Sequence, residues 1–169
     1  MTAADLERLY DYSYWANAQL FRVISDLTQE EFTRDVAGSY GSIRNALVHS
    51  LSAEWGWLDR CGGPQRGAAL KPDDYPSADV LADAWRRVEG YVREFLSNLK
   101  DEDLGKCIDF KNPRGEARKA VLGEVLQHAA NHGVHHRGQV VLLLRQLGRT
   151  PGNIDMLFYD AAKHGTTAW

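Results

Sequence analysis

The stretch His128-Ala-Ala-Asn-His132-Gly-Val-His135-His136-Arg-Gly-Gln139 holds four of the six histidines in the chain. It lies within a longer segment of helical spacing, from about Ala120 to Leu147, that stops at Gly148. On such a helix His132 and His136 are one turn apart and share a face, where two imidazoles can bind one metal ion. The stretch therefore predicts a long helix that carries metal ligands.

The apolar face of this helix follows from a rotation of about 100° per residue. It carries Leu122, Val125, Ala129, Val140, Leu143 and Leu147. His136 falls near the middle of that face and His132 close to it, whereas His128 and His135 lie near its polar boundary. Two inward imidazoles would repel each other if charged and would need several hydrogen-bond partners if neutral. A shared metal ion removes both problems, and a hydrogen-bonded pair of core histidines is the alternative.

Three further segments have the spacing of long helices, and a short one follows near the end of the chain. Ser42 is a candidate N-cap for the second long helix, Ser77 or Asp79 for the third, and Asn153 for the short last helix. The predicted helices cover residues 3–26, 42–60, 77–99, 120–147 and 154–163. This pattern predicts an all-α protein of one domain, residues 1–169, built as a four-helix bundle with a short C-terminal helix.

The sequence also predicts the local structure of the segments between the helices. Thr28-Gln-Glu-Glu31 is a capping box that predicts a brief helical turn, and residues 36–41 are expected to form a loop. Residues 62–76, rich in Gly and Pro, form the longest predicted loop. Residues 108–121 are ambiguous, because Asn112-Pro-Arg-Gly115 resembles a turn between two short extended pieces.

Composition excludes several classes of protein. The chain has 169 residues, 44% of them hydrophobic and 25% charged, with a formal net charge of −3. No basic tract indicates a nucleic-acid partner, and no apolar run is long enough for a membrane span. Cys61 and Cys107 lie far apart without a Cys-x-x-Cys spacing, which favours structural thiols in a reducing compartment. The first residues do not resemble a signal peptide, so a cytoplasmic location is expected.

His49 is the candidate for a third ligand. It lies within the second long helix beside several small residues, Asn45, Ala46, Ser52, Ala53 and Gly56. Small side chains allow another helix to approach closely, as a metal shared between helices requires. The helical wheel does not place His49 at the centre of an apolar stripe. His164, close to the end of the chain, is expected to be solvated.

These residues resemble the DinB-like superfamily, also called the DinB/YfiT-like metalloenzymes. Ser42-Ile-Arg-Asn-Ala-Leu-Val-His49-Ser-Leu-Ser-Ala-Glu54-Trp-Gly-Trp57 is similar to the first ligand helix of that family. The segment from Asn131 to Gln139 looks like its second motif, His-x-x-x-His-Arg-Gly-Gln. Leu147–Pro151 and Asp155–Tyr159 resemble the usual tail, so the resemblance covers most of the chain.

The resemblance implies a metal site at His49, His132 and His136. It also implies a four-helix bundle of up-down-down-up connectivity, one divalent metal ion such as zinc or nickel, and a homodimer. His128 and His135 are then outer or surface groups, unless one of them replaces a ligand. A second apolar patch of Val134, Val141 and Leu142 fits a dimer interface, and packing against the last helix explains it equally well.

Two functions follow from this interpretation. The first is an enzyme, a thiol S-transferase or a hydrolase, whose small-molecule substrate includes a low-molecular-weight thiol. Tyr14, Glu54 and Gln139 are candidate outer or proton-transfer groups, and Arg137 is expected to pair with a carboxylate. The second is a non-catalytic metal-binding stress-response protein with a closed site. The family name refers to induction by DNA damage and implies no contact with DNA.

Overall fold

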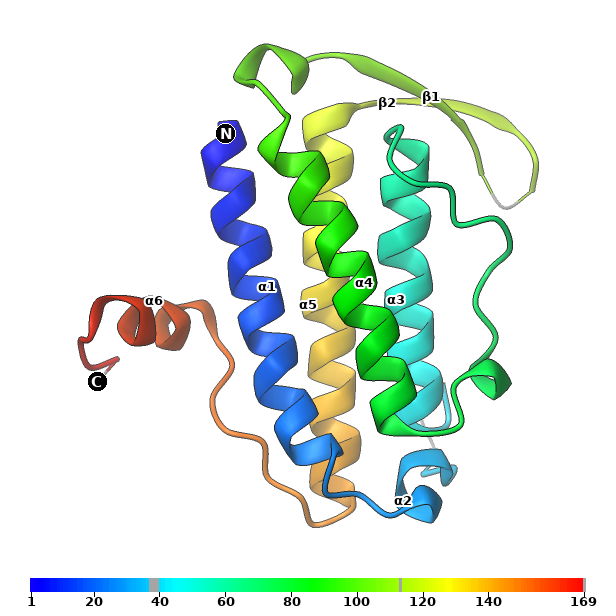
Figure 1. Ribbon diagram of the computed structural model, residues 1–169, viewed down its shortest axis with the longest axis vertical. Coiled ribbons are helices and arrows are strands. Elements are labelled where there is room, and N and C mark those ends of the chain that lie inside the picture. Colours follow the sequence, from blue (N-terminus) through cyan, green and yellow to red (C-terminus); the bar gives the residue numbers. More distant parts are fainter. Residues whose placement is uncertain (37–39, 113, 169) are drawn as a thin grey trace.

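The computed structural model describes residues 1–36, 40–112 and 114–168. Over these ranges the chain is mostly helical, with six α-helices and one two-stranded sheet (Figure 1). The long helices are α1 (Ala3–Ile24), α3 (Ile43–Arg60), α4 (Ala78–Ser97) and α5 (Leu122–Gln146). They lie side by side, with α1 and α3 each packed against both α4 and α5. The four predicted long helices are thus confirmed to within a few residues at their ends.

Side-chain caps begin two of these helices where the sequence predicts them. The Ser42 hydroxyl accepts a hydrogen bond from the Asn45 N–H at 3.1 Å, and the Ser77 hydroxyl accepts one from the Val80 N–H at 3.4 Å. Ser77, rather than Asp79, is therefore the cap of α4. Each cap satisfies a backbone donor that the first helical turn leaves without an intrahelical partner.

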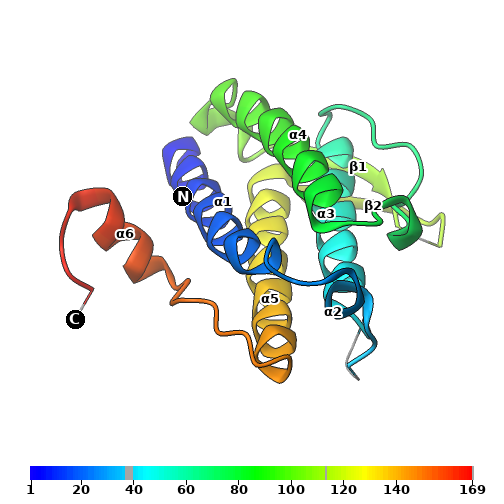
Figure 2. The ribbon, with the colours of Figure 1, turned by 60° about the horizontal axis from the view of Figure 1, so that its bottom comes forward.

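The short helices differ in how well the sequence locates them. The predicted capping box opens α2 (Gln29–Thr33), with Thr28 and Glu31 bonded reciprocally to backbone N–H groups. The start predicted for the last helix is wrong: α6 (Met156–His164) begins after Asp155 and not after Asn153. The Phe158 and Tyr159 N–H groups bond to the Asp155 carbonyl, which sets the first turn there. Helix α6 packs against α1 at the edge of the molecule (Figure 2).

A hairpin corrects the all-α assignment. Strands β1 (Cys107–Lys111) and β2 (Ala117–Val121) pair antiparallel, from Cys107 opposite Val121 to Lys111 opposite Ala117. The ambiguous segment is therefore extended, with a turn in which the Gly115 N–H bonds to the Asn112 carbonyl. Pro113 of the predicted turn lies outside the described residues. Because β2 continues through Val121, α5 begins at Leu122, two residues later than predicted.

The segment just before the hairpin, residues 104–106, holds the start of the helix that carries the histidine stretch. No side chain caps α5; instead the Leu122 N–H bonds to the Lys106 carbonyl at 2.9 Å and the Gly123 N–H to the Leu104 carbonyl at 3.0 Å. A Cβ at Gly123 would stand 3.1 Å from the Leu104 oxygen, a tighter contact than most Cβ atoms make, so the close approach favours glycine. Backbone carbonyls thus replace the side-chain cap.

The long loop after α3 is fastened to that helix. Arg66 donates to the Ser52 carbonyl and hydroxyl, and the Leu70 N–H donates to the same hydroxyl at 3.1 Å. The loop also contains a 3-10 turn, Pro72–Asp74; a second such turn, Asp101–Asp103, precedes the hairpin. Of the loop predicted at residues 36–41, positions 37–39 lie outside the described residues.

The core runs along the contact surfaces of the long helices. Its largest fully buried side chains include Leu6, Leu20, Ile24, Ile43, Leu51, Leu81, Val88, Val92, Val140 and Leu144. A smaller cluster of Tyr12, Ala16 and Tyr159 joins α1 to α6. Within the described residues, no helix has the length and hydropathy to cross a membrane.

Candidate metal centre

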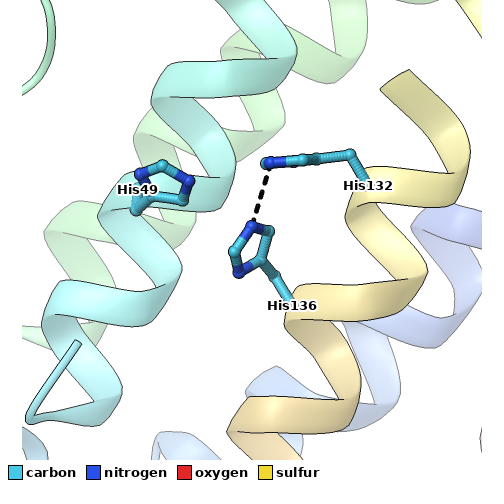
Figure 3. A group of neighbouring side chains, drawn as sticks. All are labelled: His49, His132 and His136. Atoms are coloured by element: carbon cyan, nitrogen blue, oxygen red, sulfur yellow. Dashed lines mark hydrogen bonds between the residues drawn. The ribbon is translucent and has the colours of Figure 1, made fainter. Parts of the chain in front are cut away.

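Helices α3 and α5 bring three histidines together. His49 comes from α3, and His132 and His136 come from successive turns of α5 (Figure 3). One ring nitrogen of each lies within 4.8 Å of the others, and the group has the composition of a metal site. The rings of His49 and His136 are 4.7 Å apart between centroids, and those of His49 and His132 are 5.5 Å apart. The sequence-predicted trio therefore converges in space.

The two α5 histidines face each other directly. Their Nε2 atoms are 3.0 Å apart. One of these nitrogens must carry a proton for this contact to be a hydrogen bond, and a metal ion would replace that proton with its own positive charge. The contact is consistent with a pair of ligand atoms poised for one ion.

Gln139 sets the tautomer of His136. Its Oε1 atom lies 2.8 Å from His136 Nδ1 and accepts a hydrogen bond from that N–H. The proton on Nδ1 leaves the lone pair on Nε2, the atom that faces His132. The Gln139 amide nitrogen lies 3.1 Å from Nε2 of His135 and can donate to it, which orients the amide. Gln139 is thus an outer group, as the sequence predicts, and His135 supports it.

Burial keeps the three imidazoles neutral. Desolvation lowers the pKa of His132 from 6.5 to about 4, with smaller contributions from the neighbouring histidines, first among them His136. Desolvation also lowers the pKa of His49 and is the main cause of the lowered pKa of His136. Neutral imidazoles present the lone pairs that a metal ion needs, so proton competition is weak near neutral pH.

Tyr40 covers one side of the cluster, a contact that sequence reasoning missed. Its ring stacks on His49 at 4.3 Å between centroids and 26° between planes, and it meets His136 edge-on at 5.4 Å. No periodicity could reveal this residue, because it lies in the irregular segment before α3. It supplies an aromatic contact that limits the movement of His49.

The remaining histidines lie outside the trio. His128 and His135 on α5 and His164 at the end of α6 are exposed. The His128 ring is 6.0 Å from that of His132 and packs edge-on against Trp57 at 5.1 Å. None of the three belongs to the group that could hold an ion, so no substitute ligand is indicated among the described residues.

Two of the small residues beside His49, Ser52 and Gly56, contact the long loop. A Cβ at Gly56 would stand 2.6 Å from Nη1 of Arg66, whose guanidinium also binds Ser52. Ser52 and Gly56 therefore accommodate the long loop, and α3 also packs closely against α5, as the small residues predict. The side chains on this part of α3 are small, which leaves room for the Arg66 guanidinium that lies across them.

Arg137 is expected to pair with a carboxylate, and the structure bears this out only at long range. The Glu54 carboxylate acts on it electrostatically, but Arg137 is in none of the ion pairs found among the described residues. Its side chain is buried, and it donates to Asn17 Oδ1 and to the Ser13 hydroxyl, both at 3.3 Å. The guanidinium also lies 5.4 Å from the centre of the Tyr12 ring. Burial lowers the pKa of Arg137, while Tyr12 and the negative charge of Glu54 act in the opposite direction. The residue after His136 thus anchors α5 to α1.

Tyr14 and Glu54 pair with each other instead of with the histidines. The Tyr14 hydroxyl donates to Glu54 Oε1 at 2.6 Å. Desolvation raises the pKa of both groups, although for Glu54 this hydrogen bond and the positive charge of Arg137 act in the opposite direction. The pair belongs to the interior between α1 and α3, so its predicted role as an outer group of the metal site is not supported by any described contact.

The two cysteines are free. Burial raises the pKa of the Cys61 thiol to about 12, so this group stays protonated at neutral pH and is a poor nucleophile. Cys107 is exposed at the start of β1. The structural assignment of the thiols therefore agrees with the environment of Cys61.

Known proteins resemble the chain over nearly its whole length. The sequence model of the DinB family matches residues 1–167. Protein DinB of Bacillus subtilis is 28% identical over 159 residues, covering 90% of this chain and 91% of that protein. Uncharacterized protein YizA of the same organism is 22% identical over 144 residues, covering 85% and 89%.

Two solved structures are also similar to the chain in fold. The crystal structure of a DinB-like protein from Bacillus cereus has a TM-score of 0.72 at 27% identity and covers 90% of this chain and 97% of that one. A conserved protein from Enterococcus faecalis, 15% identical, shares the fold with a TM-score of 0.59, covering 88% and 99%. The resemblance carried by the motifs around His49 and His132 is thereby confirmed, and the chain belongs to the DinB family.

Proposed function

We propose that this chain is a divalent-metal-dependent enzyme that acts on a small molecule, as a thiol S-transferase or a hydrolase. The observation that supports this most is the convergence of three imidazole nitrogens within 4.8 Å of one another. Burial at the same place lowers the pKa of all three histidines. A cluster of unprotonated donors is what a metal site requires and what an ordinary helical core lacks.

The residues present fit zinc or nickel. Imidazole is a good ligand for both, and His49, His132 and His136 would each contribute one nitrogen. When bound, the ion would supply a positive charge able to stabilise a thiolate or to acidify water. Three neutral ligands leave that charge undiminished, which favours a reactive role over a purely structural one.

The surrounding side chains prepare the site. Gln139 holds His136 in the tautomer with a free Nε2, and Tyr40 holds the His49 ring by stacking. Such outer contacts fix ligand orientation before an ion arrives. The role of these residues is therefore positional, and neither is assigned a proton-transfer step.

A non-catalytic metal-binding protein is the alternative. A closed structural site needs four ligands, whereas the ion-binding group among the described residues has three members. This count favours an open coordination position, and with it the enzyme. The alternative would regain support if the bound metal resisted exchange and accepted no thiol.

The wider organisation is part of the same proposal. We infer one domain over residues 1–169 and a four-helix bundle of up-down-down-up connectivity, supported by the directions of the long helices in Figure 1. A cytoplasmic homodimer is proposed through the face of α5 where Val134 and Leu142 are 41% and 59% exposed. Light scattering coupled to size-exclusion chromatography tests the dimer, and Leu142→Glu should shift it to a monomer.

Metal content is the first test. Protein purified without a nickel column should contain about one zinc or nickel ion per chain by elemental analysis, as one three-ligand site predicts. His49→Ala should lose the metal, and His164→Ala, which changes an exposed histidine outside the cluster, should keep it. A folded wild type that stays metal-free and cannot be reconstituted would contradict the proposal.

Turnover is the second test. The metal-loaded protein should transfer a low-molecular-weight thiol to an electrophile, or hydrolyse an ester, faster than the metal-free protein does. His49→Ala should abolish the acceleration. If the loaded site turns over neither class of substrate, the non-catalytic alternative is preferred.

A further inference from the structure

A groove between α1 and α4 is built without any residue of the helices that carry the histidine cluster. It has a volume of about 450 Å³, and its lining residues come from α1, from Ser25 just after it and from α4. These two helices lie side by side (Figure 1). The three clustered histidines come from α3 and α5 instead. We call this feature the α1–α4 groove, and it is separate from the candidate metal centre.

Two buried donors in the lining of the groove have no hydrogen-bond partner. The side chains of Asn17 and Trp85 line the groove, and the two residues are only 7% and 4% exposed. Neither Asn17 Nδ2 nor Trp85 Nε1 has an acceptor among the described residues. Buried polar groups in folded proteins are nearly always hydrogen-bonded, because an unpaired one loses its bonds to water without replacement. Two unpaired donors in one groove therefore indicate an acceptor from outside the chain.

The contacts of these two side chains show which kind of group is missing. Asn17 Oδ1 accepts a hydrogen bond from Arg137 Nη1 at 3.3 Å, which assigns the orientation of the amide and leaves Nδ2 as its unused group. An amide nitrogen and an indole nitrogen can only donate. The groove thus lacks acceptor oxygens and not a further donor.

The charges around the groove favour a neutral ligand. Two cations and two anions line it: Arg22, Arg86, Asp79 and Glu89. Arg86 pairs with Asp83, and Glu89 pairs with Arg93 at 2.8 Å, so these two groups already have partners. The lining therefore carries no net charge that would attract an ion.

An anion would also meet a negative field at Tyr14, which lines the same groove. Burial is the main cause of the raised pKa of Tyr14, and the negative charges of Glu54 and Glu89 add to it. The Tyr14 hydroxyl already donates to Glu54 Oε1 at 2.6 Å. A carboxylate ligand is thus disfavoured, and an uncharged carbonyl oxygen fits the two donors better.

The rest of the lining is mainly apolar. Phe21 meets Trp85 edge-on at 5.7 Å between ring centroids. Small side chains, among them Ala18 and Ala82, leave the groove open beside these rings. Apolar walls with a few polar groups are typical of sites that bind small molecules.

We propose that the α1–α4 groove binds a small, neutral and mainly apolar carbonyl compound through Asn17 Nδ2 and Trp85 Nε1. Solvent reaches neither nitrogen in the structure, so side chains at the rim move aside when the ligand enters. Arg22 and Arg86 are exposed and can move in this way. The site does not depend on a metal ion or on the proposed function.

A nuclear magnetic resonance titration of the full chain, labelled with nitrogen-15, tests the inference. The probes are acetophenone and ethylbenzene, which has a methylene group in place of the carbonyl. Acetophenone should shift the indole N–H signal of Trp85 downfield, because its oxygen accepts that hydrogen bond, and ethylbenzene should not. The chain has five tryptophans, so the signal that disappears in Trp85→Phe provides the assignment.

The variants isolate the donor from the apolar contacts. Trp85→Phe keeps an aromatic ring and should lower the ratio of acetophenone to ethylbenzene affinity about tenfold, the loss of one hydrogen bond to a buried donor. Trp55→Phe is the matched control, because the Trp55 indole N–H already donates to the Pro64 carbonyl at 3.0 Å. It should leave the ratio unchanged. Ala82→Leu should fill the groove and weaken both probes at least tenfold, and the melting temperature of each variant verifies folding.

Each contrary result rejects a particular part of the proposal. If neither probe shifts signals of α1 and α4, or if Ala82→Leu binds both probes as the wild type does, the groove is not a ligand site. An affinity ratio that is equal in the wild type and in Trp85→Phe would show an apolar groove without carbonyl recognition. Acetophenone binding that requires added zinc would assign the probe to the metal centre and would also overturn the inference. Failure of the groove in these tests leaves the metal and turnover tests of the proposed function unaffected.

Discussion

At the scale of single residues, His136 shows how one neighbour determines the chemistry of an imidazole. Its Nδ1–H is held by Gln139 at 2.8 Å, and its Nε2 faces His132 at 3.0 Å. The opposite tautomer would place a proton on the nitrogen that a bound metal ion would need. The capacity of His136 to act as a ligand thus depends on Gln139, three positions along the same helix.

Substituting one or the other of two adjacent histidines, His135 and His136, should have different effects on metal content. His136→Ala removes a member of the trio and should empty the site. His135→Ala removes only the group that orients Gln139, so the metal stoichiometry should stay nearly unchanged. Elemental analysis of both variants checks this, and a metal-free His135→Ala protein would show that the ligand assignment is wrong.

The lowered pKa of His132 predicts how the metal-free protein responds to acid. Its pKa is about 4 in the folded state against 6.5 ordinarily, so the unfolded chain binds more protons between these values. The free energy of unfolding should therefore fall as the pH decreases from about 6.5 towards 4. Thermal melts across that range should show a smaller decrease for His132→Gln. His164→Gln, which changes an exposed histidine, should follow the wild type.

At the scale of elements, α5 depends on residues 104–106, the segment just before the hairpin. The helix starts without a side-chain cap, and carbonyl groups of Leu104 and Lys106 bind its first N–H groups. Gly123 allows this contact because it lacks a side chain. The position of this segment therefore affects the start of the helix that carries His132 and His136.

Two glycines in α5 should respond in opposite ways to alanine. A Cβ at Gly123 would press on the Leu104 carbonyl at 3.1 Å, the acceptor of its own N–H, so Gly123→Ala should lower the free energy of unfolding by about 1–2 kcal/mol. A Cβ at Gly138 would meet no heavy atom of a neighbouring element within 4 Å, so Gly138→Ala should raise it by about 0.5–1 kcal/mol through helix propensity. Urea unfolding of both metal-free variants measures the difference. Equal stabilisation by both would refute the steric argument.

At the scale of the whole molecule, the candidate site is a product of packing between α3 and α5. These helices contact each other directly, and their histidine side chains point toward one another (Figure 3). Arg137, the residue after His136, is buried and donates hydrogen bonds to Ser13 and Asn17, which link α5 to α1. An ion at the cluster would add a further link between two of the four long helices.

Removing the metal should therefore lower the stability of the whole domain. Binding to the folded state alone adds about 2.7 kcal/mol when the free ion is at 100 times its dissociation constant. A chelator should lower the melting temperature of the metal-loaded wild type, and added zinc should restore it. His49→Ala should melt at one temperature with or without zinc. A wild type insensitive to both chelator and zinc would contradict the coupling.

The sequence predicted the long helices and three helix caps correctly, but it placed the start of the last helix wrongly. Local signals were sufficient for the long helices and for the caps at Thr28, Ser42 and Ser77, because helical spacing and N-cap hydrogen bonds involve residues close in the chain. The same kind of signal failed at Asn153, since Ile154 packs into the cluster of Tyr12 and Tyr159 rather than beginning a helix.

The sequence by itself determined the four long helices, the placement of His132 and His136 on one face of α5, and, through its motifs, membership of the DinB family. Only the tertiary structure brought His49 against them, placed Tyr40 over the cluster and hydrogen-bonded Arg137 to Asn17 and Ser13. The physical reason is distance along the chain. Helical periodicity reports contacts three or four residues apart, whereas a site between helices depends on which faces pack together.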